Sequence, residues 1–237
     1  APGIDVRWDD VEGMNAADAE VIPHAWQGGP QPTVLRDQLL AMKDGGTFII
    51  APPVNPFGCP PGPYERVSLV AHYLKQHKPK SKILILDAKA KFSKQPLFMQ
   101  AWEQLYPGMI EWVSGESGGR VFQIDVKNKI VHTESGDKHK GDVINFIPPQ
   151  KAAAIVEKAG LTNSDGWSPV NQRTFESTMQ PGIHIIGDAS IAGKMPKSGF
   201  AANSQGKVCA AAIVSAVHGK KMPEPSYVNT CYSLVSP

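Results

Sequence analysis

The sequence predicts an α/β fold in which buried strands are separated by helices. Between residues 33 and 147, short apolar runs rich in β-branched residues alternate with longer segments whose apolar side chains recur at helical spacing. Three further short runs, separated by turn residues, stand before the last of these strands. This order is typical of a nucleotide-type α/β domain with a hairpin in its crossover connection.

Residues 1–32 carry few periodic signals and predict an ordered connection between domains. His24 is a candidate metal ligand, but no second ligand lies at metal spacing, so a packed histidine is favoured. Thr33 is the expected N-cap of a first helix, which ends at Asp44-Gly45-Gly46. The apolar positions of that helix are Val34, Leu35, Leu39, Leu40 and Met42.

The rest of the chain is organised around residues 47–77. Thr47–Ala51 is predicted to be a buried strand, and Tyr64–His77 is predicted to be the helix that follows it. Such a corner normally binds a phosphate through backbone N–H groups at the helix N-terminus. Three of the residues in 60–63 are prolines, which have no N–H to offer. The corner presents Cys59 instead, near a helix N-terminus that stabilises a thiolate, and this indicates sulfur chemistry.

The following elements continue the alternation. Lys82–Asp87 is predicted to be a second buried strand, and Asp87 stands where dinucleotide-binding domains often hold the acid that binds the ribose. Without a glycine fingerprint upstream, a plain role at the strand end is preferred for Asp87. A helix over Phe92–Tyr106, interrupted at Pro96, and a strand over Ile110–Val113 come next.

A small antiparallel meander and a closing strand complete this domain. The meander is expected over Val121–Val126, Ile130–Thr133 and Asp137–Lys140, and the closing strand over Asp142–Ile147. A helix over Lys151–Ala159 is then expected to end at Gly160.

The C-terminal part contains a predicted strand, a corner and a long helix. The strand begins at Gly182 and runs into Gly187-Asp188, and the helix covers about Ala201–His218. One interpretation of the corner is a tight turn with a solvated acid. The other is a carboxylate that binds sugar-alcohol hydroxyls, while the next helix N-terminus faces a cofactor carbonyl. Spacing alone does not decide between them.

Composition narrows the possible partners and the setting. The formal net charge of +2 implies neither a nucleic acid nor a membrane surface as partner. The longest apolar run, Val208–Val217, is about half the roughly 20 residues that a membrane span requires. Three cysteines allow one disulfide in three possible pairings. Cys209 is predicted to be a buried thiol in a helix of small residues. One interpretation of Cys59 and Cys231 is a structural disulfide in a secreted protein.

The segment around Cys59, the Gly187-Asp188-Ala189 corner and the terminal Asn229-Thr230-Cys231-Tyr232-Ser233 together resemble one family. It is the flavin-binding subunit of flavocytochrome c sulfide dehydrogenase, within the two-dinucleotide-domain flavoproteins that include sulfide:quinone reductases. The resemblance runs over essentially the whole chain. It also includes Pro23-His24-Ala25-Trp26, Phe92-Ser93-Lys94-Gln95, Ile147-Pro148-Pro149-Gln150 and Asn203-Ser204-Gln205-Gly206-Lys207.

The resemblance implies a two-dinucleotide-binding-domain flavoprotein fold with FAD as cofactor. It implies that Cys59 and Cys231 form a redox-active disulfide beside the flavin ring. Gly187 and Asp188 would be the second FAD signature, with Asp188 on the ribitol. The other implied cofactor-binding residues are Gly3, where such chains leave the FAD domain, and Pro196, Lys197, Ser198 and Gly199 near the pyrimidine end of the ring.

Departures from the family predict a fragment. The family begins with a glycine-rich βαβ unit that holds the FAD pyrophosphate and with a cysteine bonded to the flavin, and neither is present in these residues. The region that docks a cytochrome is missing too, so this chain alone is expected to bind FAD weakly or not at all. The expected domains are 1–32, the exit from the FAD domain; 33–147, a second NAD-like domain; 148–219, the rest of the FAD domain; and 220–237, the start of an interface region.

The implied activity is periplasmic sulfide oxidation with a cytochrome c subunit as partner. Hydrosulfide would attack the disulfide and leave a persulfide, and electrons would pass through the flavin to the cytochrome. Glu65 is a candidate proton acceptor, or simply a first-turn acid favoured by the helix dipole. Lys197 is a candidate for stabilising the charge of the reduced flavin, or a solvated lysine. The competing hypotheses are an NAD(P)H-dependent disulfide reductase and a non-enzymatic fragment that binds a partner protein.

Overall fold

The computed structural model describes residues 1–237, and the chain forms two compact units. Unit 1 comprises Ala1–Val6, Pro56–Pro60 and Gln150–Tyr232. Unit 2 comprises Arg7–Asn55, Pro61–Pro149 and Ser233–Pro237. The chain passes into unit 1 at Gln150, two residues after the expected boundary at 147, and the roles assigned to the four expected segments stay predictions.

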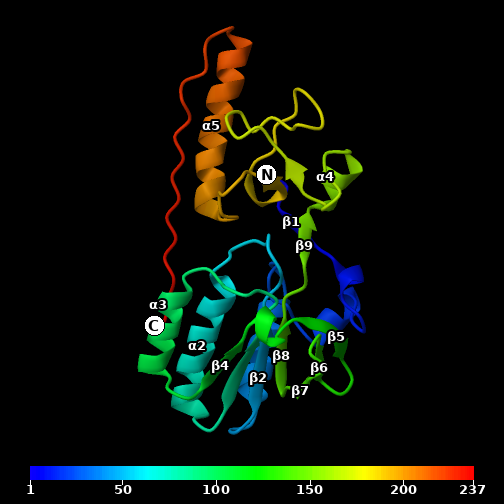
Figure 1. Ribbon diagram of the computed structural model, residues 1–237, viewed down its shortest axis with the longest axis vertical. Coiled ribbons are helices and arrows are strands. Elements are labelled where there is room, and N and C mark those ends of the chain that lie inside the picture. The colour runs from blue at the N-terminus through cyan, green and yellow to red at the C-terminus, as the bar shows by residue number, and fades with distance from the viewer. The chain divides into compact units, whose positions relative to one another are not determined.

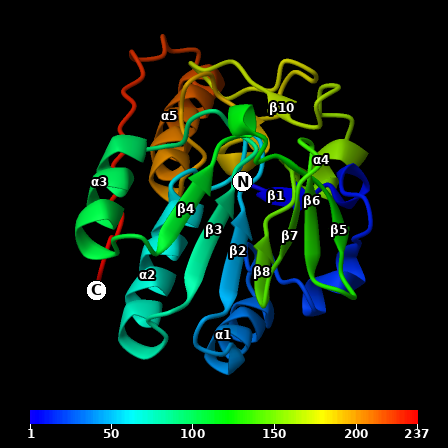
Figure 2. The same cartoon turned by 60° about the horizontal axis from the view of Figure 1, so that its bottom comes forward.

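Unit 2 is built on a four-stranded parallel sheet in the order β4-β3-β2-β8, whose strands lie side by side in Figure 2. The strands are β2 (Thr47–Ala51), β3 (Lys82–Leu86), β4 (Ile110–Val113) and β8 (Val143–Phe146). In the centre of the sheet Ile49 lies opposite Leu84 on one side and Ile144 on the other. All four strands lie where the sequence predicted them. Parallel strands buried on both faces are near-continuous apolar runs, as β2 and β8 are.

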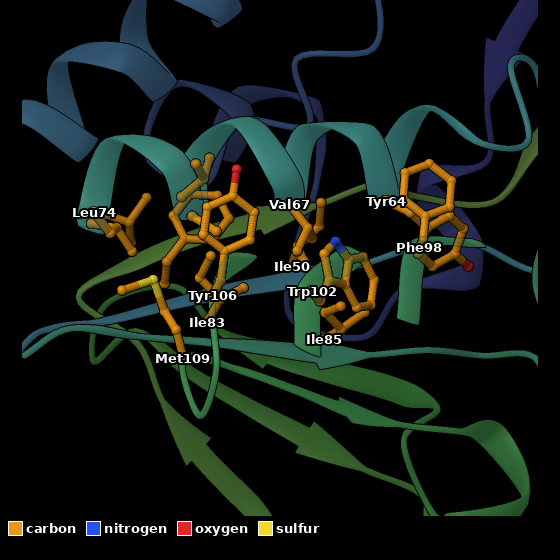
Figure 3. Packing of buried hydrophobic residues seen from close by; sticks show 14 of the residues in the cluster. Ile50, Tyr64, Val67, Leu74, Ile83, Ile85, Phe98, Trp102, Tyr106 and Met109 are labelled. Atoms are coloured by element: carbon orange, nitrogen blue, oxygen red, sulfur yellow. The ribbon is translucent and has the colours of Figure 1, made fainter. Parts of the chain in front are cut away.

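One face of this sheet is covered by three helices, α1 (Gln31–Ala41), α2 (Gly62–His77) and α3 (Gln95–Leu105). Alternate residues of β2 and β3, such as Ile50 and Ile83, point to this face because side chains alternate along a strand. Figure 3 shows side chains of α2 and α3 packed over them. The labelled residues are Ile50, Tyr64, Val67, Leu74, Ile83, Ile85, Phe98, Trp102, Tyr106 and Met109.

The other face is covered by the antiparallel meander β5 (Val121–Asp125), β6 (Ile130–Thr133) and β7 (Lys138–Lys140), as predicted. Ile49 and Ile144 of the sheet pack here against Ile124 and Val131 of the meander. Glu12 in the N-terminal connection is hydrogen-bonded to Phe122 and Ile124, which fixes that connection to the edge of the meander.

Three predicted helix starts in unit 2 are wrong. Helix α2 begins at Gly62, two residues before the predicted start at Tyr64. Helix α1 begins at Gln31, so Thr33 lies inside its first turn and is not the N-cap. Helix α3 begins at Gln95, so Pro96 lies at its start and does not interrupt it. Proline is favoured in the first helical turn, where its missing N–H would have no partner, and all three helices have a proline there.

Unit 1 contains short elements around one long helix. Strand β1 (Ile4–Val6) pairs antiparallel with β9 (Gln150–Ala152), and β10 (Ser168–Pro169) pairs parallel with β11 (Ser190–Ile191). The helices are α4 (Ala154–Lys158), a 3-10 turn at Gly187–Ala189 and α5 (Gly199–Val217). Their core includes Trp167, Phe175, Val208 and Cys209. Figure 1 shows the extended tail after α5 running back beside that helix.

Three predictions in unit 1 need correction. Residues 150–152 are strand β9, so the helix expected over 151–159 is reduced to α4, although Gly160 ends it with φ +70° as expected. Residues 182–186 form no strand, because their only ladder contact is one bridge between Glu176 and His184. Helix α5 begins at Gly199, two residues before the predicted start. No helix of the chain is long and apolar enough to span a bilayer.

Candidate functional site

Cys59 lies in the short loop of unit 1 that the chain forms between β2 and α2. The residue is exposed, and its φ of +55° is a left-handed backbone conformation that few residues other than glycine adopt. Its N–H donates to the carbonyl oxygen of Lys197 at 2.7 Å. The preceding N–H, of Gly58, donates to Gln150 Oε1 at 2.8 Å. Two consecutive hydrogen bonds therefore fix the backbone at Cys59.

The Gly187-Asp188 corner lies against this loop. Gly187 has φ +76°, and its N–H donates to Oε1 of Gln205 in α5 at 2.7 Å. A Cβ atom at Gly58 would lie only 2.8 Å from Asp188 Oδ2, so the loop approaches that carboxylate as closely as a glycine allows. Burial raises the pKa of Asp188 despite the opposing charge of Lys197. No donor of the chain is hydrogen-bonded to the Asp188 carboxylate.

Lys197 is directed into unit 1. Its Nζ donates to the backbone oxygens of Asp188 and Ser190 at 2.5 and 2.8 Å, and it lies 3.9 Å from the centre of the Trp167 ring. Burial lowers the pKa of Lys197 to about 8, although Asp188 acts in the opposite direction. These contacts show a buried lysine that ties its loop to the corner. A role toward the charge of a flavin stays a prediction.

The remaining predicted cofactor residues lie around the start of α5 and at the N-terminus. Ser198 is the N-cap of α5: its Oγ accepts from the N–H of Ala201 at 3.1 Å, and Gly199 follows as the first helical residue. Pro196 lines a mainly apolar pocket of about 320 Å³ together with residues of the tail. Gly3, with φ +80°, accepts a hydrogen bond from the N–H of Ala153 next to β9.

Cys231 belongs to the tail that follows α5. The tail is fixed to the start of α5 by two contacts: the N–H of Val228 donates to Ser204 Oγ at 3.1 Å, and Ser198 Oγ donates to Asn229 Oδ1 at 2.7 Å. Cys231 is half-buried and follows Asn229 by two residues, a span of at most about 7 Å. Lys197 and Ser198 thus contact the segments of both cysteines, and the bond between those cysteines stays a prediction.

Cys209 is confirmed as a buried residue of α5, and burial raises the pKa of its thiol. Glu65 lies in unit 2, in the first turn of α2, where its Oε1 accepts from the N–H of Leu234 at 3.2 Å. Its role as a proton acceptor stays a prediction. His24 is packed in unit 2 as expected, with Nδ1 accepting from the N–H of Trp26 at 3.0 Å.

Asp87 is wholly buried at the end of β3 in unit 2. Its carboxylate accepts from Tyr64 Oη at 2.5 Å, from Trp112 Nε1 at 3.1 Å, and from both the N–H and the Nζ of Lys89. Tyr64 also stacks on Phe92, with ring centres 3.8 Å apart. The carboxylate is saturated by the chain itself, which agrees with the expected strand-end role rather than with ribose binding.

A small pocket of about 160 Å³ lies at the carboxyl ends of β2, β3 and β8 in unit 2. This is the switch point of the sheet, where open α/β sheets bind their ligands. Pro52 and Pro53 form part of its wall. Its volume is below the roughly 300 to 1,000 Å³ that is usual for ligand sites.

Sequence reasoning did not single out several residues that shape these sites. Gln150, Gln205 and Asn229 accept the hydrogen bonds that fix the Cys59 loop, the corner and the tail, and Lys89 neutralises Asp87. The only sequence signal for the first three was their place in segments that carry the family resemblance. Nothing in the spacing of Lys89 indicated a buried ion pair.

One family model matches just under half of the chain. Residues 32–148 match the family model described as sulfide dehydrogenase [flavocytochrome c] flavoprotein chain, central. Most of unit 2 lies in the matched segment.

Solved structures share the fold. A chain of the mitochondrial ATP synthase structure from Tetrahymena thermophila is 17% identical, with a TM-score of 0.67, over 94% of this chain and 57% of its own. The NAD-dependent persulfide reductase from A. fulgidus is 16% identical, with a TM-score of 0.61, over 94% and 39%. An FAD-dependent pyridine nucleotide-disulphide oxidoreductase from Desulfovibrio vulgaris is 17% identical, with a TM-score of 0.51, over 91% and 53%.

These likenesses establish the fold: the chain holds part of a dinucleotide-binding flavoprotein architecture, as predicted. The chain spans less than two thirds of the length of each of the three structures.

Proposed function

We propose that this chain is part of a flavoprotein that oxidises sulfide through a redox-active disulfide of Cys59 and Cys231 and passes electrons to a cytochrome c subunit. The observation that carries the proposal is the pair of hydrogen bonds made by consecutive residues. Lys197 holds the backbone of Cys59, and Ser198 holds Asn229, just before Cys231. The family match over residues 32–148 supports the same reaction class.

The residues of unit 1 fit FAD. The half-buried carboxylate of Asp188 has no hydrogen-bond donor from the chain, and burial raises its pKa, so it is suited to accept hydrogen bonds from sugar-alcohol hydroxyls. The N-terminus of α5, where the helix dipole is positive, suits an electron-rich carbonyl of a cofactor. Asp188, Ser198 and Gly199 would hold FAD. When bound, FAD would supply an acceptor for the two electrons that the two cysteine thiols release on returning to the disulfide, after the outer sulfur of the persulfide has passed to a second hydrosulfide.

The cysteines carry the sulfur chemistry. Hydrosulfide attacks one sulfur of the disulfide, a new S–S bond forms to give a cysteine persulfide, and the original S–S bond breaks to release the other cysteine as a thiolate. The attacking group must be the anion, and the thiolate that leaves must be stabilised. A periplasmic setting is part of the proposal, since disulfides persist in oxidising compartments. Glu65 is proposed as the proton acceptor.

An NAD(P)H-dependent disulfide reductase is the second candidate, because the fold is shared with an NAD-dependent persulfide reductase. A nucleotide would be expected at the switch point of the unit 2 sheet. The saturated carboxylate of Asp87, the prolines at 52 and 53 and the small pocket argue against it. The reductant therefore separates the two candidates.

The test is anaerobic treatment of the oxidised chain with sulfide, followed by alkylation and intact mass measurement. In the wild type and in Cys209→Ala, the mass of the chain is expected to rise by one H₂S, because one cysteine of the pair Cys59 and Cys231 becomes a persulfide and the other a thiol. No gain is expected in Cys59→Ser or Cys231→Ser. For chain loaded with FAD, bleaching of the flavin band by sulfide and not by NADH supports the first candidate, and the reverse result supports the second. A wild-type chain that gains no sulfur contradicts the proposal.

A further inference from the structure

One peptide of unit 1 contacts the segments of both cysteines. The carbonyl oxygen of Lys197 accepts from the N–H of Cys59 at 2.7 Å, and Ser198 Oγ donates to Asn229 Oδ1 at 2.7 Å. Because Lys197 and Ser198 are consecutive, neighbouring atoms of the chain hold both the Cys59 loop and the tail.

This peptide is itself immobilised on both sides. The Lys197 side chain is only 8% exposed and is held by the carbonyls of Asp188 and Ser190 and by the face of Trp167. Ser198 is the N-cap of α5, and its Oγ also accepts from the N–H of Ala201. Because this peptide is held by the Gly187-Asp188 corner and by α5, it holds the two cysteine segments that are hydrogen-bonded to it in fixed positions.

The Cys59 backbone is a conformation that needs such support. A non-glycine residue at φ +55° is disfavoured and persists only where its surroundings determine it. Here the N–H of Gly58 is fixed by Gln150 and the N–H of Cys59 by Lys197. The direction in which the Cys59 side chain leaves the backbone is therefore set by these two bonds.

We propose that Lys197 and Ser198 are positioning residues for the dithiol pair: by fixing both cysteine segments to one peptide, they set the equilibrium between dithiol and disulfide. The inference rests on the proposed function, because it assumes that Cys59 and Cys231 form the redox pair. With glutathione the reaction is balanced: the two thiols and one glutathione disulfide give the protein disulfide and two glutathione thiols. Fixing the cysteines together raises the effective concentration of one thiol toward the other.

The decisive variant is Asn229→Ala, which removes the bond between Ser198 and the tail but leaves the cap of α5 in place. The chain is equilibrated in glutathione buffers of graded ratio, alkylated, and the oxidised fraction is measured by mass. Loss of one hydrogen bond that orders the pair is expected to lower the equilibrium constant for disulfide formation by about three- to tenfold. Ser198→Ala is expected to give the same shift, and Ser198→Thr, which keeps the hydroxyl, is expected to restore the wild-type constant.

The matched control is Ser114→Ala. Ser114 caps a short 3-10 helix in unit 2 by accepting from the N–H of Ser117 at 3.1 Å, so this variant loses a similar cap away from the cysteines. Its glutathione constant is expected to equal that of the wild type. If Asn229→Ala and Ser198→Ala lower the unfolding midpoint but leave the constant unchanged, the positioning role is refuted. A constant that rises would mean that the bonds strain the disulfide, and it refutes the proposal too. A wild-type chain that forms no disulfide between the two cysteines at any ratio overturns the proposed function itself.

Discussion

Replacing Lys89 with methionine is expected to destabilise unit 2 strongly. Lys89 Nζ lies 2.7 Å from Asp87 Oδ1, and the two side chains are 9% and 0% exposed. Removing one partner of a buried ion pair leaves an uncompensated charge, which typically costs about 3–5 kcal/mol. Tyr64, Trp112 and the Lys89 N–H still donate to the Asp87 carboxylate, so we expect the lower end, about 3 kcal/mol.

The measurement is urea unfolding followed by tryptophan fluorescence, because four of the five tryptophans, at positions 8, 26, 102 and 112, lie in unit 2. The double variant Lys89→Met with Asp87→Asn removes the buried charge as well, and it is expected to recover at least half of the loss. A coupling free energy of about 1 kcal/mol or more between the two sites is the signature of a charge-dependent interaction.

The matched control is Lys82→Met at the start of β3, the strand that leads to Asp87. Lys82 is exposed and donates to the carbonyl of Gly108, so its loss is expected to change the free energy of unfolding by no more than about 0.5 kcal/mol. If Lys89→Met unfolds within about 1 kcal/mol of the wild type, Asp87 does not depend on Lys89, and the argument that the acid is saturated by the chain fails.

Three further substitutions in unit 2 test other contacts. Burial, and then the charge of Arg66, lowers the pKa of His24 below 6.5. The unfolded chain therefore binds this proton more readily than the folded chain, and stability falls as the pH drops below 6.5. His24→Gln is expected to flatten that decline in urea midpoints measured from pH 7 to 5. Gly119→Ala would place a Cβ atom 2.2 Å from the carbonyl oxygen of Val113, and thermal unfolding is expected to show a loss of more than about 2 kcal/mol. Ile50→Ala, at a wholly buried position in Figure 3, is expected to lower the free energy of unfolding by about 2–5 kcal/mol in urea. A loss below about 1 kcal/mol for Ile50→Ala would contradict its packing in the core. A wild-type melting curve for Gly119→Ala would contradict the close contact with Val113, and an unchanged pH slope for His24→Gln would contradict the lowered pKa of His24.

The sheet of unit 2 could be predicted because its signal is local. The central strands Thr47–Ala51 and Lys82–Leu86 are largely buried, so each is an apolar run that can be recognised without knowledge of its neighbours. Helix starts were less predictable, because a proline such as Pro96 can begin a helix or break it, and only the surrounding chain decides.

The elements of unit 1 could not be predicted in the same way. Residues 182–186 have the composition of a strand but find only a single bridging partner, and Gln150–Ala152 forms a strand because Ile4–Val6 lies beside it. A strand forms only where a second segment pairs with it, and the periodicity of one segment does not show whether that partner exists. The same limit applies to the site, where the partners of Cys59 and Asp188 come from segments more than ninety residues away in the sequence.

Asp87 and Asp188 each follow an apolar run in the sequence, but their environments are opposite. Asp87 is wholly buried and accepts from four donors of the chain, so it has nothing left to offer a ligand. Asp188 is partly buried, has a raised pKa and receives no donor from the chain, although a glycine lets the Cys59 loop approach it. A carboxylate that has lost part of its hydration without gaining a partner is destabilised until a donor arrives. We therefore propose Asp188, next to the Cys59 loop, as the acid that binds a hydroxyl-rich cofactor, whereas Asp87 stabilises the fold of unit 2.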